Sequence, residues 1–274
     1  MWRFLRHPNV LPLMGALMSG NWFAMVSEWM PNGNINQFVK AHPEVNRLRL
    51  VRPLLAPLLP SFRQLKNSQL AGVPKGLIYL HGNGMAHGDL KGVSFRSLEL
   101  LWCLTSSLIK ANILVDGTGQ ARLADFGLLT IVSDPANVLS SSSYTQGGSV
   151  RWMSPELIDA EHFRFERGCP TKASDCYALG MVIYETVSGK LPFHRYTDLT
   201  AFVKAVKGKH PRREPVFKEN LWRMLKLCWA YDPNDRPSIG NVLRCLEAAS
   251  NSRGSFARGR NAFGARVYRT YRVS

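Results

Sequence analysis

Four polar side chains that could act together on an anionic group lie between His87 and Gly127. Asp89 and Lys91 belong to the run His-Gly-Asp-Leu-Lys at 87–91, Asn112 opens Asn-Ile-Leu-Val-Asp, and Asp125 opens Asp-Phe-Gly. Carboxylate and amide oxygens are hard ligands that suit Mg²⁺, and a lysine ammonium can neutralise a phosphate oxygen. A fold that brings these four groups together could bind a phosphate–metal complex.

The elements that must position these residues are a few short strands followed mainly by helices. Apolar strand-like runs occupy 10–15 and 22–27, and a hairpin is expected over 113–124, with its turn at 116–119. Residues 174–188 are apolar nearly all round, which indicates a buried helix. Further helices are expected at 34–39, 70–81, 221–229 and 239–249.

The order of these motifs resembles the catalytic core of a eukaryotic protein kinase, where an H-x-D-L-K-x-x-N loop precedes D-F-G. The run Trp-Met-Ser-Pro-Glu at 152–156 is similar to the family's A-P-E motif, and the family then pairs Glu156 with Arg236. The resemblance covers 1–249 and is closest to fungal Ser/Thr kinases of the tyrosine-kinase-like group. It implies an α+β, protein-kinase-like fold with a truncated small β lobe and a mainly helical large lobe.

The resemblance also implies a role for each candidate residue. Asp89, Lys91 and Asn112 are the expected catalytic residues, and Asn112 and Asp125 are the expected Mg²⁺ ligands. ATP would be held by the hinge and by the strand after the loop, at Glu28, Met30, Leu114 and Asp125. A lysine two residues after Asp89 is typical of Ser/Thr kinases. The implied partners are ATP and a protein substrate.

One spacing departs from the family. Asn112 lies twenty-three residues after Asp89, where the family has five, and removing 93–110 restores the family spacing. A second interruption, 51–69, contains three prolines that exclude a continuous helix. Both segments can be encoded with splice-donor sequences at their starts and AG at their ends. We favour the hypothesis that they are translated introns, and the alternative is genuine surface insertions.

The expected domain plan has three parts. Residues 1–30 form a partial small lobe and hinge, 31–249 form the large lobe with inserts at 51–69 and 93–110, and 250–274 form a basic disordered tail. Neither a G-x-G-x-x-G loop nor a strand-borne V-A-I-K lysine is present in this sequence. We therefore expect a protein Ser/Thr kinase in a signalling role whose activity in this chain is weak or lost. The alternative is a protein-binding module without catalysis.

Gly88 stands where the family's H-R-D motif has arginine. A phosphate on the activation segment would lack this guanidinium as a partner, so we expect little dependence on phosphorylation there.

Composition excludes several other classes. The net charge is +16, of which residues 251–274, 51–69 and 93–110 supply six, three and one, so nucleic-acid binding is not expected except through the Arg-rich tail. Five cysteines fit no zinc spacing and indicate reduced thiols. No apolar run is long enough for a membrane span, and no signal-peptide pattern opens the chain. The expected compartment is the cytoplasm, with the nucleus as the alternative.

Overall fold

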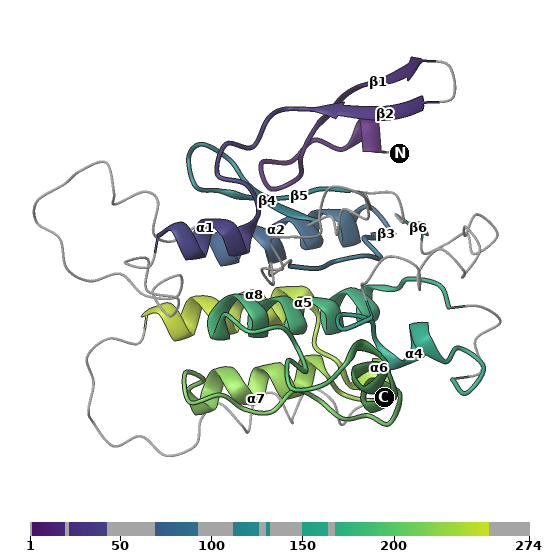
Figure 1. The fold of residues 1–274 in the computed structure, drawn as a ribbon, viewed down its shortest axis with the longest axis vertical. Helices are drawn as coiled ribbons and strands as arrows, with labels where there is room; N and C mark the ends of the chain where they lie inside the picture. Colours follow the sequence, from purple (N-terminus) through teal and green to yellow (C-terminus); the bar gives the residue numbers. More distant parts are fainter. Residues whose placement is uncertain are drawn as a thin grey trace, which may run out of the picture.

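Short β-hairpins lie on one side of a body of packed helices (Figure 1). The computed structural model describes residues 2–19, 22–42, 69–92, 112–125, 130–131, 150–163 and 168–251. Both predicted inserts lie outside these residues, except for Gln69, where a helix begins. The expected α+β architecture, with few strands and a mainly helical large part, is confirmed.

Three two-stranded antiparallel sheets make up the strand region. They pair β1 (Leu13–Ser19) with β2 (Trp22–Ser27), β3 (Met85–Ala86) with β6 (Thr130–Ile131), and β4 (Ile113–Val115) with β5 (Ala121–Leu123). The hairpin predicted over 113–124 is confirmed. The strand predicted at 10–15 begins later, because Val10 forms a parallel bridge with Leu123 of β5 instead of joining β1.

The helices follow the strands in the order of the chain. They are the 3-10 turn η1 (Trp2–Phe4), α1 (Ile35–Ala41), α2 (Gln69–Gly82), α4 (Pro155–Ile158), α5 (Lys172–Ser188), α6 (Asp198–Val206), α7 (Glu219–Cys228), the 3-10 turn η5 (Pro233–Asp235) and α8 (Ile239–Asn251). The expected helices near 34, 70, 174, 221 and 239 are confirmed, whereas α6 was not predicted. Residues of the predicted basic tail after Asn251 lie outside the described part.

Capping groups explain where helices α1 and α5 begin. Asn34 caps α1 and accepts hydrogen bonds from the N–H groups of Asn36 and Gln37, while the Gln37 side chain returns a bond to the Asn34 N–H. Thr171 and Ser174 form the same reciprocal box at α5. Each box satisfies backbone donors that the first turn leaves unpaired. At the other end of α5, Gly189 takes the left-handed conformation (φ 69°) that stops the helix.

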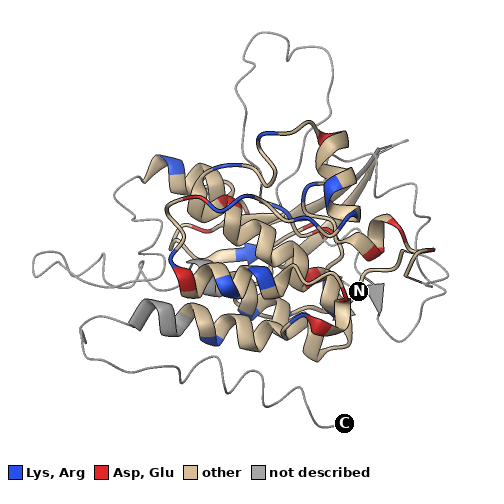
Figure 2. Ribbon diagram, turned by 90° about the horizontal axis from the view of Figure 1, so that it is seen from below, with Lys and Arg blue, Asp and Glu red and all other residues tan. Residues whose placement is uncertain are grey.

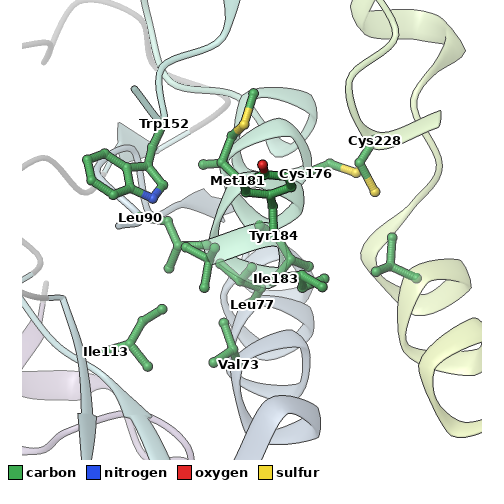
Figure 3. Close-up of a cluster of buried hydrophobic side chains, with 14 of the residues drawn as sticks. Val73, Leu77, Leu90, Ile113, Trp152, Cys176, Met181, Ile183, Tyr184 and Cys228 are labelled. Carbon is green, nitrogen blue, oxygen red and sulfur yellow. The ribbon is translucent and has the colours of Figure 1, made fainter. Parts of the chain in front are cut away.

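Helix α5 is the centre of the core. Its residues from Ser174 to Val187 are buried, so the helix is enclosed on all sides. Figure 3 shows its side chains between those of α2, of the β4 strand and of the segment near Trp152. The buried set in this view includes Val73, Leu77, Leu90, Ile113, Trp152, Cys176, Met181, Ile183, Tyr184 and Cys228. The core therefore ties the catalytic-loop region to the helical body.

Two further sequence expectations can be compared with the described residues. Cys169, Cys176, Cys228 and Cys245 are free thiols, as expected, and Cys103 lies outside the described part. Among the helices of the described ranges, none combines the length and apolar character needed to cross a membrane.

Candidate active site

The loop from His87 to Lys91 is attached to the core helix through one buried carboxylate. Asp175, in the first turn of α5, is 1% exposed and accepts hydrogen bonds from the backbone N–H of His87 (2.8 Å) and of Gly88 (3.0 Å). His81 Nε2, at the end of α2, lies 2.9 Å from the same carboxylate. Charged acceptors form stronger hydrogen bonds than neutral ones, so Asp175 fixes the start of the loop.

The imidazole of His87 connects this loop to the segment that carries Asp125. His87 is fully buried, and its Nε2 lies 3.2 Å from the carbonyl oxygen of Ala124. A carbonyl can only accept, so Nε2 carries the proton and Nδ1 is left to accept from the N–H of Asp89 (3.4 Å). The Ala124 N–H in turn donates to the carbonyl of Asn112 (2.9 Å). Three segments distant in sequence therefore meet at His87.

Asp89, Lys91 and Asn112 form a single cluster. Lys91 Nζ and Asn112 Nδ2 both contact Asp89 Oδ2, at 2.9 and 2.8 Å, and Asn112 Nδ2 also donates to the Asp89 carbonyl. The side chain of Asp89 is 15% exposed and that of Lys91 is 6% exposed. A carboxylate that touches solvent beside a nearly buried ammonium and amide is arranged to receive a proton from, and to orient, an incoming polar group.

Asn112 reaches this cluster despite its distance along the chain. Its N–H lies 3.4 Å from the carbonyl oxygen of Lys91. If 93–110 were absent, Gly92 would join Ala111, and this contact would span four consecutive residues, as the hydrogen bond of a β-turn does. Lys91 and Asn112, which flank the predicted insert, thus lie as close together as the family spacing requires.

Asp125 comes directly after Ala124 in the chain, and its backbone has an unusual conformation. Its φ is 58°, in the left-handed region that few residues other than glycine adopt. Such a conformation costs about 1–3 kcal/mol in a non-glycine residue, although aspartate tolerates it better than most. Phe126 and Gly127, the rest of the predicted motif, lie outside the described residues. The backbone contact between Ala124 and Asn112 places Asp125 one residue from the position where Asn112 is held.

The predicted nucleotide residues lie at the junction of the hinge and the β4–β5 hairpin. Met30 is buried in a small cluster with Leu11 and Ala124, against which Leu114 packs. The Met30 carbonyl accepts a hydrogen bond from the N–H of Gly33 (3.0 Å). Glu28 is exposed. Met30 and Leu114 therefore lie close together, and Glu28 lies two residues before Met30 in the predicted hinge.

The family model described as "Protein tyrosine and serine/threonine kinase" matches residues 1–93 and 98–246. The chain belongs to this kinase family. Serine/threonine-protein kinase STY17 of Arabidopsis thaliana is 29% identical over 89% of the chain and 35% of its own length. Serine/threonine/tyrosine-protein kinase HT1 of the same plant is 24% identical over 89% and 51%. Cytokinesis protein sepH of Emericella nidulans is 28% identical over 88% and 14%. The chain thus spans between about a seventh and about half of the length of these three relatives.

The kinase domain also contains the buried ion pair that the resemblance implied. Arg236 donates to both oxygens of Glu156, at 2.6 and 2.7 Å, and the two side chains are 0% and 2% exposed. Arg236 also donates to the carbonyl of Ala230 (2.9 Å). A buried pair satisfied on both sides is a structural link, here between the A-P-E-like segment and the region after α7.

One buried oxygen atom without a hydrogen-bond partner is compatible with the Mg²⁺ site predicted for this kinase domain. Asn112 Oδ1 is buried and has no hydrogen-bond partner, which is rare for a buried amide oxygen. Among the residues that the structure describes, no group of three or more His, Cys, Asp or Glu side chains could hold a metal. Mg²⁺ commonly binds through one or two protein oxygens together with substrate phosphates and water. Asn112 and Asp125 therefore suit that ion.

Sequence reasoning missed two buried acidic residues of α5 that accept hydrogen bonds from other segments. Asp175 was placed only inside the predicted helix 174–188, and its role depends on contacts across 88 residues of chain. Glu185 was also missed: it accepts from Asn36 Nδ2 (2.8 Å) and Trp152 Nε1 (3.1 Å). The available signal was an acidic residue inside an otherwise apolar buried helix, because a buried charge needs partners.

Proposed function

We propose that this kinase domain transfers the γ-phosphate of ATP to serine or threonine hydroxyls of a protein substrate, in a signalling role. The observation that carries the proposal is the convergence of Lys91 Nζ and Asn112 Nδ2 on Asp89 Oδ2, at 2.9 and 2.8 Å. Phosphoryl transfer requires mainly positioning and charge neutralisation, which such a cluster provides. Several similar proteins are named serine/threonine-protein kinases, which supports this substrate class.

Each residue of the cluster has a role that follows from its chemistry. The partly exposed carboxylate of Asp89 would accept the proton of the attacking hydroxyl. Lys91 would place its ammonium against the transferring phosphate while its contact with Asp89 keeps it oriented. Asn112 would hold the loop through Nδ2 and offer its unpartnered Oδ1 as a ligand. Asp125 would supply the second oxygen ligand.

Mg²⁺ bound by Asn112 and Asp125 would neutralise phosphate charge. The adenine would lie against Leu114, with the hinge backbone at Glu28 and Met30 as its hydrogen-bond partners. A polypeptide limited to residues 1–274 has neither the glycine-rich loop nor the strand lysine, so we expect that polypeptide by itself to transfer phosphate slowly. Loss of a single transition-state donor typically costs about 10²–10³ in rate.

Nucleotide binding provides the direct test. We expect Mg-ATP to raise the melting temperature of the chain, because a ligand that binds only the folded state stabilises it. Asn112→Ala and Asp125→Asn should each reduce this shift, and Asp235→Asn, an exposed carboxylate on η5, should leave it unchanged. Transfer of labelled phosphate to casein, lost in Asp89→Asn, would then test catalysis.

The second candidate is a binding module that lacks catalysis. The spacing of twenty-three residues between Asp89 and Asn112, where the family has five, favours it. A chain that melts at the same temperature with and without Mg-ATP, and transfers no phosphate, would support the module and contradict the kinase proposal.

A further inference from the structure

Helix α6 exposes two of its larger apolar side chains to solvent. The residues that it buries are alanines, Ala201 and Ala205, at 1% and 2% exposure. Leu199 is 73% exposed and Val203 is 41% exposed. Residues four apart share a helix face, so the two alanines line one face, which packs toward the body and α4, and Leu199 and Val203 line another. A surface helix normally buries its largest apolar side chains, so this arrangement is reversed.

The ring of Tyr196 extends the exposed apolar strip that Leu199 and Val203 form. Tyr196, two residues before α6, is 43% exposed, and Lys204 Nζ lies 4.4 Å from the centre of its ring. Because Lys204 is on α6, this contact keeps the ring beside the helix. We call Tyr196, Leu199 and Val203 the α6 face. A contiguous apolar strip with a polar rim is a typical feature of a docking surface.

The chain around the α6 face is strongly basic. Residues 190–223 contain nine Lys and Arg and three Asp and Glu. Figure 2 shows Lys and Arg in blue and Asp and Glu in red on the described ribbon. All three acids are already in ion pairs: Asp198 with Arg151 (2.6 Å), Glu214 with Lys190 (2.6 Å), and Glu219 with Arg213 (2.7 Å). The positive charge of this segment is therefore not balanced locally.

Three of the cations outside these ion pairs lie at the C-terminal end of the strip. Lys207 follows Val203 by one helical turn, and Lys209 and Arg212 follow on the exposed loop after α6. Among the described residues, no ion pair joins any of these three to an acid. The α6 face thus combines an apolar strip with cations at its C-terminal end.

We propose that the α6 face docks a protein segment whose apolar side chains are accompanied by acidic residues. The apolar groups would lie on Leu199, Val203 and Tyr196, and the acids would meet Lys207, Lys209 and Arg212. Charge complementarity of this kind sets specificity and speeds association. Under the proposed function the segment belongs to the protein substrate, and in that respect the inference rests on the proposed function.

A protein segment fits this face better than a lipid surface. One side of α6 is packed against the body through its alanines, so the helix presents a strip about one helical turn long. Helices that bind in a lipid interface offer a broad apolar face along their whole length. A short strip with charges at one end matches two or three anchor side chains of a peptide.

The experiment measures binding of two fluorescein-labelled peptides to the full chain by anisotropy. One peptide consists of Glu-Leu-Leu-Glu repeats and the other of Lys-Leu-Leu-Lys repeats. We expect the acidic peptide to bind more tightly, with an affinity that falls as salt is added. Leu199→Ser and Lys207→Glu should each weaken it about tenfold or more. Ile78→Ser on α2, with a similar exposure to Val203, and Lys75→Glu are the matched controls and should bind as the parent does.

Three results would overturn the inference. The first is equal affinity of the chain for the two peptides, and the second is an unchanged affinity for the acidic peptide in both α6-face variants. The third is binding to phosphatidylserine vesicles that is tighter than binding to the acidic peptide and is weakened by the same two variants. Circular dichroism verifies that both variants fold, and their exposed positions favour this. Mg-ATP thermal shifts on the same variants should be unchanged. Peptide binding without any Mg-ATP shift would support the α6 face while contradicting only the proposed function.

Discussion

Asp175 accepts a 3.0 Å hydrogen bond from the backbone N–H of Gly88, and this bond joins the loop of residues 87–91 to the core helix α5. Gly88 has a φ of 83°, a conformation that glycine adopts without strain. The family's arginine at this position is thus replaced by a residue that suits the backbone and contributes no guanidinium. The expectation that a phosphorylated activation segment matters little here stays a prediction, since residues 132–149 lie outside the described part.

Removal of the Asp175 carboxylate should destabilise the protein. In Asp175→Ala the N–H groups of His87 and Gly88 would lose their acceptor, and a buried donor without a partner costs about 1–3 kcal/mol. We expect urea unfolding to give a free energy of unfolding lower by about 3 kcal/mol or more. Asp235→Ala, on the exposed η5 turn, should change it by less than about 0.5 kcal/mol. Equal effects in the two variants would contradict the anchoring role.

Two glycines of α2 should respond in opposite ways to alanine. A Cβ at Gly76 would lie 2.7 Å from the carbonyl oxygen of Asn9 and 2.8 Å from Leu123 Cδ1, so Gly76→Ala forces the helix away from the segment that pairs with β5. Nothing lies within 4 Å of a Cβ at Gly82. We expect Gly76→Ala to lower the melting temperature and Gly82→Ala to raise it slightly, because alanine in a helix is favoured by about 0.5–1 kcal/mol. A stabilising Gly76→Ala would show that this approach is looser than described.

The β4–β5 turn should make stability depend on acid. Burial opposes ionisation of Asp116, but hydrogen bonds from Thr118, Gln120 and Arg122 together lower its pKa below the ordinary value. A carboxyl whose pKa is lower when folded stabilises the protein above its unfolded pKa of about 3.9, and this contribution is lost as the pH falls through the folded value. The free energy of unfolding of the parent should therefore approach that of Asp116→Asn at low pH. A difference between them that stays constant from neutral to acidic pH would refute this.

Excision of residues 93–110 should leave the site intact. Lys91 and Asn112 are already within 3.4 Å, O to N, so the shortened chain needs only a tight turn. Shortening the spacing from twenty-three residues to five should raise the free energy of unfolding by about 1.4 kcal/mol from loop entropy alone. Denaturant unfolding of both chains measures this difference. As a control, excision of five residues from the tail, 270–274, should have no effect, and loss of folding on removal of 93–110 would favour a genuine structural insertion.

Local patterns predicted those parts of the fold whose causes are local. The β4–β5 hairpin follows from its Asp116–Gly119 turn, and α5 follows from an apolar run between a capping threonine and Gly189. The cluster of Asp89, Lys91 and Asn112 was predicted because motif spacing could be restored by one excision. Helix α6 was missed because its buried face consists of alanines while Leu199 and Val203 are exposed. The start of β1 was misplaced because Val10 pairs with Leu123, over a hundred residues away. Contacts between residues so far apart in the sequence leave no periodic pattern in it.

The close approach of Lys91 and Asn112 has a practical consequence. When the two residues that flank a segment lie next to each other in the fold, the segment can be replaced by one of different length without moving those two residues. The junction between Gly92 and Ala111 is therefore a natural place to install an epitope or a fluorescent reporter near the catalytic centre without using either terminus.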